Sequence, residues 1–188
     1  QRLNTDADVL VELVRGYLSY LFKINNRNII QSMIALFPIG TYLSALKQGG
    51  HTWRIRDLDQ GNLTFINHYF LTSQFCNWST PTMVNAFSRL AQAAGETGKP
   101  FPIEAIRTVA TSKNRTSRIR VNQFLSNPWL ATKIVMPSRQ YIFADRKPQV
   151  DHIFPMRLHN TDETYRRLVD VVWNFQPLPA EINLHKSN

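Results

Sequence analysis

Residues 149–158 read QVDHIFPMRL, an apolar segment that carries an acid and an imidazole side by side. Its composition is typical of a short strand, and WNFQPL at residues 173–178 predicts a second one. RQYIF at residues 139–143 has the same character. Asp151 and His152 admit two interpretations, which are a polar pair facing water at a strand end and the first part of a catalytic metal site. The residues that decide between them lie near the C-terminal end of the sequence.

The chain before these strands predicts a layer of helices. Helical periodicity or capping residues mark the segments 5–22, 29–46, 64–75, 79–95, 103–113 and 117–127. Pro38 and Gly40 interrupt the most apolar of them, which therefore predicts a buried, broken helix rather than a membrane span. No signal peptide is visible and the chain begins with Gln1, so we expect a fragment boundary there.

Several apolar side chains in these helices are expected to form the core. In the first segment they recur with a helical period, at Val9, Leu10, Leu13, Val14, Tyr17, Leu18, Leu21 and Phe22. Phe65, Tyr69 and Phe70 are expected in the core as well. His68, which lies among them, is interpreted as a packing or surface residue rather than a ligand.

The segment 79–95 has the clearest helix boundaries. Ser79 or Thr80 can cap its N-terminus, Pro81 suits its first turn, and Gly95 can end it. We therefore expect a helix between these residues.

The composition is that of a globular protein. Of the 188 residues, 43% are hydrophobic and 19% are charged, which argues against an intrinsically disordered chain. The single cysteine, Cys76, cannot form an internal disulfide, so a reducing, cytoplasmic location is expected. There is no Gly-rich phosphate loop, so no nucleotide site is predicted in this chain.

The net charge of +9 is concentrated in one part of the chain. Between Arg107 and Pro148, nine cationic side chains stand against Asp145 alone. Such an excess attracts polyanions, nucleic acid first among them, although it is also compatible with a solvated surface that keeps the protein soluble. The candidates for DNA contact are Arg115, Arg118, Arg120, Arg146 and Lys147.

Polar residues downstream of Asp151 and His152 complete a pattern. Asn174 lies in the second predicted strand, Asn183 follows nine residues later, and Lys186 three residues after that, in a segment that begins like a helix. This order of strand, loop, strand and helix resembles the ββα-metal fold of HNH endonucleases. That family has an Asp-His pair, a central Asn, a His or Asn nine residues later and often a Lys three residues beyond. The Asn variant is similar to the HNH domain of RNA-guided CRISPR nucleases.

The resemblance implies a role for each residue. His152 would be the general base, and Asp151 and Asn183 would hold one Mg²⁺ or Mn²⁺ ion. Asn174 would brace the loop and help to position His152, and Lys186 would reach a phosphate or steady the site. The residue types suit this chemistry, because a neutral imidazole can accept a proton near physiological pH and carboxylate and amide oxygens suit hard cations.

The sequence departs from the family pattern in two places. Met156 occupies the position after HIFP where the family usually has a basic residue, and Arg157 comes next. The sequence ends at Asn188, soon after the proposed ligand, so we expect a truncated or frayed helix there. His185 is an alternative ligand, but it is two residues out of register, which turns it about 200° around a helix from Asn183.

The resemblance also implies an architecture and a context. We expect an α+β fold with a mostly α-helical subdomain at residues 1–135 and a ββα-metal motif at residues 136–188, together forming one compact unit. With its helical region followed by the DHIFP and NFQPL stretches, the chain resembles the C-terminal half of bacterial anti-phage restriction proteins of the GmrSD and phosphorothioate-sensing types. The expected partners are therefore DNA and an N-terminal ParB-like domain of the same protein, and no membrane.

Three functional hypotheses stay open from the sequence. The first is a metal-dependent endonuclease or nickase that cuts phage or other foreign DNA. The second is an HNH fold that has lost catalysis and only binds nucleic acid, which predicts salt-sensitive binding without cleavage. The third is a helical interaction domain in which the DHIFP stretch is accidental. RNA is a possible substrate in place of DNA.

Overall fold

The computed structural model describes residues 7–21, 30, 32–117, 119–120, 123, 149–153, 164, 169, 174–178 and 182. The chain divides into two compact units, one of Gln1–Leu21 with Ser32–Ile119 and one of Phe22–Gln31 with Arg120–Asn188. The boundary predicted between residues 135 and 136 falls outside the described residues, so that division stays a prediction.

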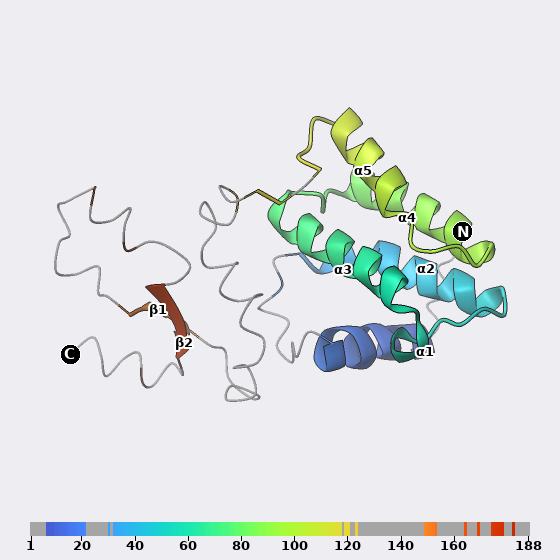
Figure 1. The fold of residues 1–188 in the computed structure, drawn as a ribbon, viewed down its shortest axis with the longest axis horizontal. Coiled ribbons are helices and arrows are strands. Elements are labelled where there is room, and N and C mark those ends of the chain that lie inside the picture. The colour runs from blue at the N-terminus through green and yellow to red at the C-terminus, as the bar shows by residue number, and fades with distance from the viewer. Residues whose placement is uncertain are drawn as a thin grey trace. The chain divides into compact units, whose positions relative to one another are not determined.

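The first unit is built from helices (Figure 1). In chain order they are α1 (Ala7–Val11), the π-helix η1 (Glu12–Leu21), the 3₁₀ turn η3 (Met33–Leu36), α2 (Phe37–Gln48), the 3₁₀ turn η4 (Ile55–Asp57), α3 (Gln60–Phe75), α4 (Pro81–Glu96) and α5 (Ile103–Ser112). Helix α2 packs against α4, and α5 contacts both α3 and α4. The prediction that the chain is mostly helical is confirmed for the residues described.

Aromatic rings fill the centre of this unit. The ring of Tyr69 lies 5.3 Å from that of Phe101, 6.0 Å from that of Phe87 and 6.3 Å from that of Trp78, measured between centroids. All four side chains are fully buried. Edge-to-face and tilted pairs at these separations stabilise a core beyond the apolar area that they bury. This cluster therefore joins α3, α4 and the segment that precedes α5.

The side chain of Asn62 adds a polar link inside the same core. Its Nδ2 donates to the Tyr42 hydroxyl at 2.8 Å, and its Oδ1 accepts from the backbone N–H of Phe101 at 2.8 Å. The Tyr42 hydroxyl in turn donates to the carbonyl of Lys99 at 2.8 Å. At the start of α3, the Asp59 carboxylate caps the helix by accepting from the Asn62 N–H at 2.9 Å. Asn62 thus connects α2, α3 and the α4–α5 loop.

Gly95 permits the close approach of α2 and α4. A Cβ atom at this position would lie 2.7 Å from both the Ala45 Cβ and the Tyr42 carbonyl oxygen. The predicted role of Gly95 as the end of the helix is wrong, because α4 runs on to Glu96 and the left-handed residue that follows it is Gly98, with φ of 65°. The glycine is needed for packing between helices and not for termination.

Three predicted core positions in the helices are wrong. Val9, Leu13 and Tyr17 are buried, whereas Leu10 and Val14 are exposed. Val9, Leu13 and Tyr17 recur every fourth position along one face, whereas Leu10 and Val14 lie off that face. Leu18 is buried as predicted. On α3, Tyr69 and Phe70 are buried as predicted, but Phe65 is exposed.

Helix starts also differ in detail from the prediction. Pro38 does not break a helix, since it stands in the first turn of α2, where its missing N–H costs nothing. Thr80 is the N-cap of α4 and Pro81 its first residue, but Thr80 makes no side-chain capping bond. The Ser79 hydroxyl instead donates to the carbonyl of Ser73 at 3.4 Å.

The second unit contains a two-stranded antiparallel sheet of β1 (Gln149–His152) and β2 (Phe175–Leu178), drawn in brown and red in Figure 1. The register pairs Asp151 with Gln176 and His152 with Phe175. A strand was predicted at residues 149–154 and another at 173–178, and the structure confirms them over Gln149–His152 and Phe175–Leu178. Pro177 pairs with Val150, and in the described part of the chain both strands are edge strands, where proline is tolerated.

Other predicted elements of this part of the chain are not tested. The strand at residues 139–143 lies outside the described residues, and so does most of the helix at residues 117–127.

Within the described parts of the chain, no helix combines the length and the apolar character that a membrane crossing requires.

Replacing Asn62 with alanine should lower the free energy of unfolding by about 2–3 kcal/mol, because two buried hydrogen bonds are lost and the Phe101 N–H keeps no acceptor. Urea unfolding followed by circular dichroism measures the change. Asn85→Ala, at an exposed position of α4, is the matched control and should change stability by less than about 0.5 kcal/mol. Equal effects of the two substitutions would contradict the buried network.

Stability should fall as the pH rises above about 10, because burial raises the pKa of the Tyr17, Tyr42 and Tyr69 hydroxyls above their usual value. The folded state keeps these protons while the unfolded state releases them, so the stabilisation is complete below pH 10 and is lost above it. Tyr69→Phe should make this decline shallower. It should also leave stability at pH 7 unchanged or higher, since the Tyr69 hydroxyl finds no hydrogen-bond partner within the described structure. Urea titrations between pH 7 and 11.5 test both statements, and a steeper decline in the variant would refute them.

Candidate functional site

The β1–β2 hairpin carries the predicted Asp-His pair. Asp151 and His152 are both partly exposed at the end of β1. The Asp151 Oδ2 atom accepts from the Gln176 Nε2 atom across the sheet, at the long distance of 3.4 Å. Because successive residues of a strand point to opposite faces, Asp151 shares a face with Gln176 and His152 leaves the strand on the other side. The two side chains can therefore approach a common ligand only around the end of β1.

Asn174 ties together the segments that meet at this hairpin. Its side chain is buried, and its Nδ2 donates to the carbonyl of Val169 at 2.7 Å. Its own carbonyl accepts from the N–H of Ile153 at 2.7 Å, directly after the Asp-His pair. Asn174 thus joins β1 to the segment that leads into β2.

The remaining predicted site residues are described only in part. Asn183 and Lys186 lie outside the described residues, although their neighbour Ile182 is helical and exposed. Among the residues that the structure describes, no group of three His, Cys, Asp or Glu side chains gathers at one point. Asp151 offers carboxylate oxygens at an accessible position, which is the donor type that Mg²⁺ and Mn²⁺ prefer. This residue fits a hard cation.

Two of the predicted DNA contacts, Arg115 and Arg120, are described. The N–H of Arg115 donates to the carbonyl of Ala110 at 3.0 Å, in the turn that ends α5 around Asn114, whose φ is 55°. Arg120 is exposed, and its backbone N–H donates to the Gln123 Oε1 atom at 2.7 Å. The two arginines belong to different units of the chain. The other candidates are outside the described residues, namely Arg118, Arg146 and Lys147.

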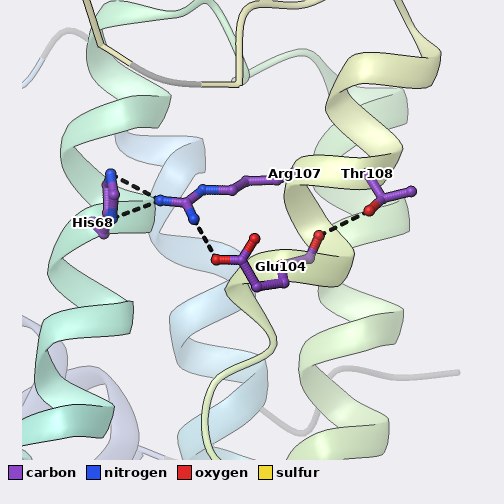
Figure 2. A network of polar contacts seen from close by, with 4 residues as sticks. All are labelled: His68, Glu104, Arg107 and Thr108. Carbon is purple, nitrogen blue, oxygen red and sulfur yellow. Dashed lines mark hydrogen bonds and ion pairs between the residues drawn. The ribbon is translucent and has the colours of Figure 1, made fainter.

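A polar network between α3 and α5 was not predicted (Figure 2). The Arg107 Nη2 atom lies 2.8 Å from Nδ1 and 3.0 Å from Nε2 of His68, and the Arg107 Nη1 atom forms an ion pair with Glu104. A guanidinium can only donate and a neutral imidazole has one nitrogen without a hydrogen, so one of the two ring nitrogens accepts from it. His68 is therefore a packing residue as predicted, with a specific cationic partner. The spacing of Glu104 and Arg107 on one helix was visible in the sequence, but the contact with His68 was not, because the two residues are 39 positions apart.

A shallow depression of about 500 Å³ opens beside this network. Its lining comes from α5 and the segment after it, and consists of Glu104, Arg107, Thr108, Thr111, Ser112 and Ser117. The hydroxyl of Thr108 donates to the Glu104 carbonyl at 3.0 Å and that of Ser112 to the Val109 carbonyl at 2.8 Å. The residues that line the depression thus all carry polar side chains, and one of them is a guanidinium.

Comparisons with known proteins yield no match, since the chain corresponds to no family model, to no curated protein and to no solved structure.

Asn174→Asp should loosen the hairpin, because a carboxylate cannot donate to the Val169 carbonyl and would face it in a buried position. Leaving such groups unpaired costs about 1–3 kcal/mol. Hydrogen exchange measured by mass spectrometry should show faster exchange in peptides that cover residues 149–153 and 174–178. Peptides from α4 and the exposed-site variant Asn85→Asp serve as controls, and unchanged protection of the hairpin would contradict the bracing role.

Proposed function

We propose that the chain is a metal-dependent endonuclease of the HNH, or ββα-metal, class that acts on DNA. The observation that carries the proposal is the β1–β2 hairpin, which pairs the Asp151-His152 strand with the strand that follows Asn174. Two further observations support it, namely the two hydrogen bonds by which Asn174 joins these segments and the helical state of Ile182 beside the proposed ligand Asn183.

The proposed chemistry assigns a task to each side chain. His152 takes the proton from the attacking water, and its place at the end of β1 leaves the imidazole accessible. Asp151 and Asn183 would hold one Mg²⁺ or Mn²⁺ ion, which when bound supplies positive charge to the scissile phosphate and the leaving oxygen. Asn174 holds the loop on which His152 depends, and Lys186 contacts a phosphate.

DNA is held by its backbone in this proposal. The positive charge between residues 107 and 148 attracts phosphates without reading sequence. Arg115, Arg118, Arg120, Arg146 and Lys147 are the proposed contacts. The nuclease acts as a nickase or endonuclease of a cytoplasmic bacterial anti-phage restriction protein, alongside an N-terminal ParB-like domain.

Incubation of supercoiled plasmid with the protein and Mg²⁺ or Mn²⁺ should yield nicked or linear product, and EDTA should abolish it. His152→Ala should reduce the rate by about 10²–10⁴-fold, because general-base catalysis is lost. Asp151→Asn and Asn183→Ala should also lower it by weakening metal binding. His51→Ala removes an exposed histidine of the first unit and should leave the rate unchanged.

Two results would argue against the proposal. Cleavage that survives His152→Ala would exclude this residue as the base. Plasmid binding at low salt without cleavage, in both this chain and the full-length protein, would favour a catalytically inactive module that only binds nucleic acid.

A further inference from the structure

The depression beside α5 is lined by one cation and one carboxylate that differ strongly in exposure. The Arg107 side chain is only 14% exposed, whereas that of Glu104, its ion-pair partner one turn earlier, is 76% exposed. Exposed carboxylates contribute little to stability through such pairs, because water competes for them. The Arg107 guanidinium is mostly buried, so it needs an anionic partner, and an incoming anion can take the place of Glu104.

The guanidinium of Arg107 stays in position without Glu104. Its Nη2 atom is held by His68 on α3, independently of the Nη1 atom that contacts the carboxylate (Figure 2). Its Nε atom is buried and has no hydrogen-bond partner within the described structure. Because a buried atom is out of reach of an external ligand, the donor that an anion can reach is Nη1, the atom that Glu104 occupies. A phosphate offers more acceptor oxygens than a carboxylate, and Arg is the side chain best matched to it.

Further positive charge lies close by in the chain. Lys113 is exposed and Arg115 partly exposed in the turn that ends α5, two turns after Arg107. Thr111 and Ser117 contribute hydroxyl groups to the lining of the depression. Among the described residues around the end of α5, three cations stand against the acid Glu104, and Arg107 is the one of the three that lines the depression. This excess of positive charge favours an anionic ligand over a cationic one.

We propose that this depression binds one backbone phosphate of the DNA, with Arg107 as the charged contact and Glu104 as the carboxylate that the phosphate displaces. The identity of the ligand as DNA rests on the proposed function. The site adds to the nuclease residues a phosphate contact in the first unit, at a position that the charge pattern alone did not single out. His68 acts as the positioning residue that aims the guanidinium.

Fluorescence anisotropy with a labelled duplex of about 20 base pairs tests the proposal. The full chain is used in a His152→Ala background and without divalent metal, so that no cleavage occurs. Arg107→Gln should weaken binding by about 3–10-fold and reduce the slope of log K against log salt by about 1, since one phosphate contact is lost. Glu104→Gln should strengthen binding about 3-fold by releasing Arg107.

Matched controls separate a local contact from a change in net charge. Arg89→Gln and Glu96→Gln alter the same charges at exposed positions of α4 outside the depression and should have clearly smaller effects. Effects equal to those of the controls, or no DNA binding by any variant at low salt, would overturn the proposal. Thermal melting shows whether Arg107→Gln is folded, and Glu104→Gln gives an independent test because loss of structural support cannot raise affinity.

Competition distinguishes a backbone phosphate from a free one. Inorganic phosphate and ATP should displace the duplex only weakly, through their contribution to ionic strength. The displacement should be the same for the protein with Arg107 and for the Arg107→Gln variant. Displacement at low concentration that requires Arg107 would show a small-molecule phosphate site and overturn the assignment to DNA.

The phosphate contact at Arg107 and the nuclease activity can be refuted separately. Binding that depends on Arg107 in a protein without His152-dependent cleavage would support this site and refute the nuclease. His152-dependent cleavage, with no effect of Arg107→Gln on affinity, would support the nuclease and refute this site.

Discussion

The buried amide of Asn62 is the constraint from which the arrangement of the first unit follows. A polar group without water must have both its donor and its acceptor paired, and here the partners are Tyr42 on α2 and the backbone of Phe101 before α5. Apolar contacts would tolerate small shifts of these elements, but the two hydrogen bonds do not. The ring of Phe101 is thereby held against Tyr42 and Tyr69, at 5.3 Å from each.

The position of α5 is a consequence of this anchor. The helix begins at Ile103, two residues after Phe101, so its direction is set where the chain leaves the core. Arg107 then lies one turn along, at the height of His68 on α3, and the guanidinium bridges the two helices (Figure 2). The polar network and the depression beside it therefore depend on a hydrogen bond made in the core.

The second unit is organised by a different amide. Asn174 links the end of β1 and the segment before β2 through one side-chain and one backbone hydrogen bond, both 2.7 Å long. The sheet has only four residues in each strand, and two strands alone are marginally stable in water. The two hydrogen bonds of Asn174 therefore help to hold Asp151 and His152 at the end of β1. The proposed catalytic residues thus lie where the backbone is held by polar contacts, while the proposed phosphate contact at Arg107 lies on a packed helix.

The sequence by itself determined the elements. Periodicity, prolines and capping residues indicated the regions of α1 to α5, though not the turn η4 or the start of α2. The short apolar segments located β1 and β2. These signals arise from neighbours in the chain. The Asp-His pair and Asn174 were also recognisable in the sequence, from their residue types and their spacing. Only the tertiary structure decided which faces are covered, so Leu10, Val14 and Phe65 proved exposed and Gly95 proved to be a packing residue. It alone brought His68 to Arg107, since a contact between residues 39 positions apart depends on how whole helices pack and leaves no local pattern.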